Sequence, residues 1–73
     1  MNLSDAPTVV VANGHSVPHV QTSTLEHFLI SQKLLPRSVV VELNGEPVAP
    51  SEFATRLLHP GDRLEIVRVV AGG

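Results

Sequence analysis

Two Asn-Gly pairs, at residues 13–14 and 44–45, each come directly after a run of β-branched residues. A tight two-residue hairpin turn needs positive φ at both central positions, and Asn followed by Gly meets that need at low cost. The runs that precede the turns, 8–12 and 38–43, have the composition of strands. The sequence therefore predicts two β-hairpins.

The strands that return from these turns are marked by proline. The first covers residues 16–20 and contains Pro18, which has no N–H to donate to a sheet ladder, so we expect it at a sheet edge or at an irregularity. The second is short and begins at Pro47. A turn at residues 59–62 has Pro second and Gly third, as a type II turn prefers, and the strongest predicted strand follows it over residues 63–70.

Between the two hairpins the apolar pattern changes to a helical period. Ser23 and Glu26 have the spacing of a capping box, in which a hydroxyl at the helix start and a glutamate three residues later satisfy free backbone N–H groups. Pro36 ends the pattern, so we predict a helix over about residues 24–34. Its buried face is predicted to carry Leu25, Phe28 and Leu29.

Two short elements complete the prediction: a helical turn at residues 50–53 and a short strand at 56–58. One main helix covers one face of a small mixed sheet, which makes the expected fold class α+β with four to five strands. The expected organisation is a flexible extension over 1–7, one domain over 8–70 and a flexible tail over 71–73.

The last strand carries apolar residues on both faces. By alternation Leu64, Ile66, Arg68 and Val70 point one way, while Glu65, Val67 and Val69 point the other way. A single helix covers one face, and the opposite face is expected to be polar. Apolar side chains there indicate either a docking surface beside the tail or residues tucked under a loop.

Composition excludes several function classes. The chain has 73 residues, no cysteine and a formal net charge of −2, with its five basic residues scattered along the sequence. These features argue against disulfides, thiol chemistry and nucleic-acid binding. No apolar run approaches membrane-spanning length and no signal pattern opens the chain, so the expected location is the cytoplasm.

Histidine, serine and glutamate side chains give no catalytic constellation. His15 and His19 fall on a predicted strand, where four residues span about 13 Å, too far to share one metal ion without a fold back. His27 and His59 have no local partners, so no metal site is expected. No serine lies on a nucleophile-elbow motif, and Glu26, Glu52 and Glu65 are expected to be cap and surface groups.

The sequence ends in Ala71, Gly72 and Gly73. Glycine has no Cβ, so a Gly-Gly segment is thin enough to thread into a narrow active site and bring a carboxylate there. A carboxylate is a poor electrophile until it is activated, for example as an acyl-adenylate made from ATP. This pattern is typical of a substrate or carrier, although two terminal glycines also occur with no function.

The stretch from Gly61 to Gly73, GDRLEIVRVVAGG, resembles the last strand and tail of small ubiquitin-like sulfur carriers of the ThiS/MoaD superfamily, and most closely the ThiS family of thiamine biosynthesis. Residues 41–48, VELNGEPV, are similar to the family's middle strand and turn. The resemblance covers roughly residues 8–73. It departs from the family in the amino-terminal extension and in the His59-Pro60 step before the turn.

This resemblance implies a β-grasp fold and a carrier that is itself no enzyme. An E1-like adenylyltransferase of the ThiF type would activate the Gly73 carboxylate with ATP, and a persulfide sulfur donor would convert it to a thiocarboxylate. A thiazole synthase of the ThiG type would receive the sulfur. Gly72 and Ala71 would keep the arm slim, Val67, Arg68 and Val69 would contact partners, and no cofactor or metal would be bound.

Three alternatives stay open at this point. The first is a carrier for another sulfur pathway, such as the small subunit of molybdopterin synthase, although the sequence lacks the proline-containing approach to the tail associated with that type. The second is a ubiquitin-like protein modifier whose Gly73 is joined to a lysine amine. The third is a non-covalent interaction module in which the terminal glycines are incidental.

Overall fold

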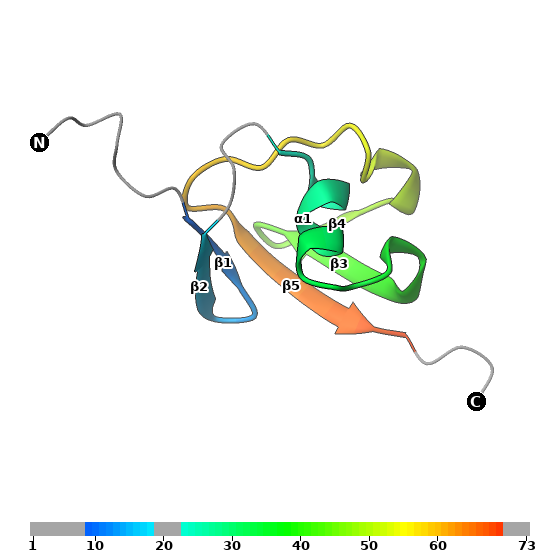
Figure 1. Cartoon of the computed structure of the whole chain (residues 1–73), viewed down its shortest axis with the longest axis horizontal. Coiled ribbons are helices and arrows are strands. Elements are labelled where there is room, and N and C mark those ends of the chain that lie inside the picture. The colour runs from blue at the N-terminus through cyan, green and yellow to red at the C-terminus, as the bar shows by residue number, and fades with distance from the viewer. Residues whose placement is uncertain (1–8, 19–22, 70–73) are drawn as a thin grey trace, which may run out of the picture.

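Five strands form one mixed sheet in the residues that the computed structural model describes, 9–18 and 23–69 (Figure 1). Their spatial order is β2-β1-β5-β3-β4, with β1 and β5 parallel and the other neighbours antiparallel. The strands are β1 (Val9–Ala12), β2 (His15–Pro18), β3 (Val39–Leu43), β4 (Glu46–Val48) and β5 (Arg63–Arg68). Together with one main helix, this arrangement confirms the expected α+β class and β-grasp fold. The predicted extension over 1–7 and tail over 71–73 lie outside the described residues.

Both Asn-Gly pairs form the predicted hairpin turns. Asn13 and Gly14 have φ of 50° and 83°, and Asn44 and Gly45 have φ of 52° and 87°. The left-handed conformation at two successive residues matches the twist of the flanking strands. β2, which carries Pro18, is an outermost strand of the sheet, as its missing N–H predicts.

The helix α1 (Leu25–Ser31) begins differently from the prediction. Its N-cap is Thr24 rather than Ser23, and the Thr24 hydroxyl accepts a hydrogen bond from the His27 N–H at 3.1 Å. With Thr24 as cap, the third helical position belongs to His27, so Glu26 cannot complete a capping box. The two preceding N–H groups, of Leu25 and Glu26, donate to carbonyls of the 53–56 loop at 2.8 and 2.9 Å.

The helix also ends earlier than the predicted residue 34. Lys33 adopts a left-handed conformation with φ of 62°. Its N–H donates to the Ile30 carbonyl, and the Leu34 N–H donates to the Leu29 carbonyl, both at 2.9 Å. This is the Schellman pattern, in which a left-handed residue closes the last turn. Pro36 therefore does not stop the helix but opens a 3-10 turn, η2 (Pro36–Ser38).

The remaining short elements follow the prediction in part. The helical turn predicted at 50–53 is present as η3 (Pro50–Glu52). The strand predicted at 56–58 is wrong, because Leu57 forms a single bridge with Thr24 and the next residue, Leu58, turns into the core. The predicted strand over 63–70 ends at Arg68, and residue 70 lies outside the described part of the chain.

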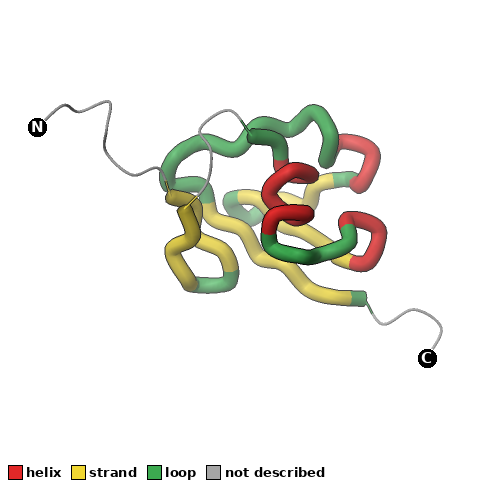
Figure 2. The backbone as a smooth tube through the Cα atoms, in the orientation of Figure 1, coloured by secondary structure: helices red, strands yellow, loops and turns green. Residues whose placement is uncertain are grey.

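The core lies between α1 and the covered face of the sheet. Phe28, on the inner face of α1, and Leu64, on β5, are both 1% exposed. The buried apolar residues are Val10, Leu25, Phe28, Leu29, Val39, Val41, Leu43, Val48, Phe53, Leu58 and Leu64. Figure 2 shows the helical segments grouped near β3 and β4, with none beside the β1–β2 hairpin.

Truncation of Phe28 should remove a large share of the stability of the fold. Phe28→Ala is expected to lower the free energy of unfolding by about 3–5 kcal/mol, since a buried aromatic ring is replaced by a cavity. A chain of this length has only about 4–11 kcal/mol of stability in total. Urea denaturation followed by circular dichroism measures the loss. Ile30→Ala, on the exposed side of the same helix, is the control and should change stability by less than about 0.5 kcal/mol. Equal losses in the two variants would contradict this core assignment.

Candidate functional site

The end of β5 is the part of the described structure nearest in sequence to the tail. β3 pairs with β5 over its whole length, from Leu43 opposite Leu64 to Val39 opposite Arg68. On the other side β1 pairs only with the first two residues of β5. Beyond the strand, the Val69 N–H still donates to the Ser38 carbonyl at 2.8 Å. The last described residue is therefore anchored to the sheet.

Asn13 extends the β1 side of this pairing through its side chain. The Asn13 amide nitrogen donates to the Ile66 carbonyl at 3.0 Å, and its oxygen accepts from the Ile66 N–H at 2.7 Å. The amide thus offers one donor and one acceptor, as a strand residue would. The tip of the first hairpin is fastened in this way to the middle of β5.

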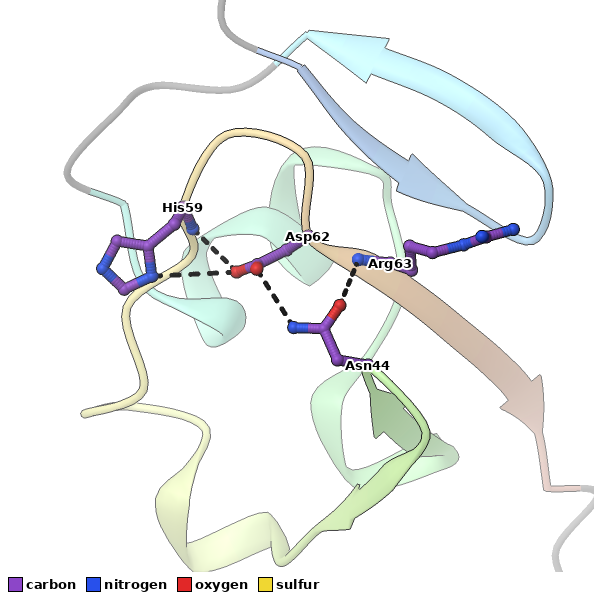
Figure 3. Close-up of polar contacts among 4 residues, drawn as sticks. All are labelled: Asn44, His59, Asp62 and Arg63. Carbon is purple, nitrogen blue, oxygen red and sulfur yellow. Dashed lines mark hydrogen bonds and ion pairs between the residues drawn. The ribbon is translucent and has the colours of Figure 1, made fainter.

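Asn44, the first residue of the other Asn-Gly turn, fastens the start of β5 (Figure 3). Its oxygen accepts from the Arg63 N–H at 2.9 Å, and its nitrogen donates to the Asp62 carboxylate at 3.1 Å. The second Asp62 oxygen accepts from the His59 N–H at 2.8 Å, and the His59 ring lies 3.8 Å from it. These contacts fix the 59–62 turn, where Gly61 has a φ of 85°.

Two exposed valines pair on the uncovered face near the end of β5. Val67 and Val40 lie opposite each other across β5 and β3 and are 62% and 54% exposed. The exposure of Val67 agrees with its predicted outward direction. Val69, which follows the end of β5, is 50% exposed and lines a hollow that Arg68 also borders. Val40 was not predicted, although it stands at an alternate position of a β-branched run and the same parity argument could have identified it.

Arg68 does not join the pair of Val40 and Val67. By strand alternation it points to the same side as Leu64 and Ile66, the side that α1 covers, and it borders two surface hollows there. The three predicted partner-contacting residues, Val67, Arg68 and Val69, are thus divided between the two faces of the sheet. Ala71, Gly72 and Gly73, the predicted reacting arm, lie outside the described residues.

The histidine and carboxylate side chains, from which the sequence predicted no metal or catalytic site, form no such cluster in the described structure. Over residues 9–18 and 23–69, no three His, Asp or Glu side chains are close enough to share a metal ion. Glu52 pairs with Arg56 at 3.6 Å on the surface, and Glu26 and Glu65 lie on α1 and β5. None of the described helices is long and apolar enough to span a membrane.

Comparison with known proteins gives one consistent result. The ThiS family model matches residues 5–73. The crystal structure of a thiamine biosynthesis protein (ThiS) from Geobacter metallireducens has a TM-score of 0.73 at 26% identity, covering 89% of this chain and 99% of that one. The solution NMR structure of a thiamine biosynthesis protein from the same organism has a TM-score of 0.72 at 26% identity, covering 89% and 87%. Among curated proteins no significant match is found.

Asn13→Asp should weaken the attachment of the first hairpin to β5. Aspartate tolerates the same left-handed backbone, but it loses the N–H donor and places a carboxylate oxygen against the Ile66 carbonyl. We expect a loss of about 1–2 kcal/mol in the free energy of unfolding and faster hydrogen exchange at the Ile66 amide. Unchanged exchange at Ile66 would show that the amide contact does not hold the strand.

Proposed function

Because this chain belongs to the ThiS family, we propose that it carries sulfur for thiamine biosynthesis as a thiocarboxylate formed on the Gly73 carboxylate. The observation that supports this role is the family match through residue 73 on a chain whose last described residue is hydrogen-bonded to a rigid sheet. In this role the protein is a co-substrate of partner enzymes and not a catalyst.

Activation is the first chemical step of the proposal. An E1-like adenylyltransferase of the ThiF type would direct the Gly73 carboxylate onto the α-phosphorus of ATP, forming an acyl-adenylate and releasing pyrophosphate. The carbonyl carbon then becomes electrophilic, because AMP is a good leaving group. Ala71 and Gly72 offer little side-chain bulk, which lets a narrow active site admit the arm.

Sulfur transfer follows. The terminal sulfur of a partner's persulfide attacks the acyl carbon and AMP leaves, and a second thiol then reduces the resulting S–S bond to leave the thiocarboxylate. A thiazole synthase of the ThiG type would accept this sulfur for thiazole formation. The chain contains no cysteine, so no thiol of its own competes for the activated acyl group.

The exposed valines suit recognition by these partners. Val40 and Val67 form an exposed apolar pair on the uncovered face. Next to the pair, Glu42 and Glu65 lie opposite each other, both exposed. Like charges directly opposite are unfavourable, and a basic group on a partner would relieve them. A partner surface that is apolar with a flanking cation therefore fits this face.

The mass of the intact protein tests the carrier role. After incubation with ATP, a ThiF-type enzyme and a persulfide donor, we expect the mass increase that replaces one oxygen by sulfur. Deleting Gly73, or adding one residue after it, should abolish the change, because both displace the carboxylate from the active site of the partner. One extra residue before Met1 is the matched control and should leave the change intact.

Two further outcomes would overturn the proposal. An unchanged mass with an adenylating partner of proven activity would exclude the carrier role. A thiocarboxylate that supports molybdopterin formation but not thiazole formation would place the carrier in a different pathway.

Replacing both open-face valines should weaken partner recognition. Threonine keeps the shape of valine, so Val40→Thr with Val67→Thr should leave the fold intact while exchanging two methyl groups for hydroxyls. We expect the KM for the carrier in the adenylation reaction to rise about tenfold, with kcat unchanged. Ile30→Thr, a similarly exposed position on α1, serves as the control. Equal effects at Ile30 and at the valine pair would contradict the assignment of this face.

A further inference from the structure

Two surface hollows meet at Arg68 on the helix-covered side of the sheet. One, of about 480 Å³, lies between the β1–β2 hairpin and α1. The other, of about 320 Å³, lies between the segment after α1 and the end of β5. Leu34 and Arg68 line both hollows, which therefore adjoin. We call the two together the tail-side groove.

The groove exists because α1 is short. The helix has seven residues and is closed by the left-handed Lys33, so no helical segment lies beside the β1–β2 hairpin in the described structure (Figure 2). Val17, Leu34 and Ile66 are only partly buried there and pack against the core. They provide an apolar floor that a second apolar group could cover.

The ionisable residues that line the groove are all basic. They are His15, Lys33 and Arg68, and among the described residues no aspartate or glutamate lines either hollow. This is unusual for a chain with a formal net charge of −2. Neither Lys33 nor Arg68 takes part in an ion pair within the described residues. The cations of the groove can therefore bind carboxylates, and its partly buried apolar residues can contact an apolar side chain.

The backbone of Arg68 adds a feature specific to peptides. The carbonyls of Asp62 and Leu64 accept bonds from the β1 side, and Ile66 bonds there with the Asn13 amide. Since strand backbone groups alternate in direction, the N–H and C=O of Arg68 point to that side too. β1 has already ended there, so among the described residues they have no strand beside them. A small anion would leave these groups unused, whereas an extended peptide pairs with them.

We propose that the tail-side groove binds an extended segment of a partner protein that carries apolar side chains between carboxylates. Its backbone pairs with Arg68, an apolar side chain covers Leu34 and Ile66, and its carboxylates meet Lys33 and Arg68. The inference rests on the proposed function for the identity of the partner, an enzyme that acts on Gly73. The partner would thus hold the carrier immediately before the reacting arm.

Titration of the ¹⁵N-labelled full chain with the synthetic peptide acetyl-Glu-Leu-Val-Leu-Glu-amide tests the groove directly. The amides of Lys33, Leu34, Arg68 and Val69 should shift most. Acetyl-Lys-Leu-Val-Leu-Lys-amide, the matched control peptide, should produce much smaller shifts. Largest shifts at Val40, or no shifts at millimolar peptide, would overturn the proposal. Equal shifts with sodium acetate or inorganic phosphate alone would also overturn it, because a small anion would then suffice.

Charge reversal shows whether the two cations carry the binding. The double variant Lys33→Glu with Arg68→Glu should lower the affinity for the acidic peptide about tenfold, since two surface ion pairs become repulsive. Glutamine at both positions should lower the affinity for the acidic peptide about threefold. This milder variant tests the site if the charge-reversed variant folds poorly. Arg63→Glu, on the same strand but with its side chain on the opposite face, is the control and should bind as the unaltered chain does. A similar loss in all three variants would contradict the site.

The enzyme reaction separates this inference from the proposed function. With the ThiF-type enzyme, the Lys33→Gln and Arg68→Gln variant should raise the KM for the carrier while kcat stays constant. If the unaltered chain acquires no thiocarboxylate but its groove still binds the acidic peptide, the carrier role fails and the groove stands. If the thiocarboxylate forms and the peptide does not bind, the proposed peptide-binding role of the groove is wrong and the carrier role stands.

Discussion

The pairing of β5 between β1 and β3 is the interaction on which the rest of this structure depends. β3 supports β5 to its end, whereas β1 supports only its beginning. The chain leaves β1 at the Asn13 turn, and the Asn13 side chain then supplies one further pairing step at Ile66. The strand therefore loses one neighbour shortly before Val69, the last described residue, while the hydrogen bond from Val69 to Ser38 holds that residue to the sheet.

Local patterns in the sequence predict most of the fold because turn chemistry and side-chain periodicity act over a few residues. They locate both Asn-Gly turns, the edge position of Pro18 and the buried face of α1. The ends of the helix could not be predicted in the same way. Ser23 and Thr24 are both good caps, and the choice is made by the 53–56 loop, which bonds the first N–H groups of the helix.

Other features depend on contacts that no local pattern contains. Lys33 has a left-handed conformation that is usual for glycine or asparagine, so the sequence did not predict that the helix ends early. Parity predicted the outward direction of Val67 and could have predicted that of Val40, but the pairing of the two valines depends on the register between β3 and β5. The bonds between Asn13 and Ile66 join residues 53 positions apart.

The two outer strands of the sheet are protected against pairing with other copies. In a two-residue hairpin the hydrogen-bonded pair lies next to the turn, so the N–H positions of residues 18 and 47 face outward. Both positions are prolines, which have no N–H to offer. Such edges resist the strand-to-strand growth that leads to aggregation. A small protein with exposed valines on its sheet can thereby stay dispersed at high concentration. The backbone of Arg68 is a further strand position without a neighbouring strand among the described residues, and it lies three residues before the predicted reacting arm.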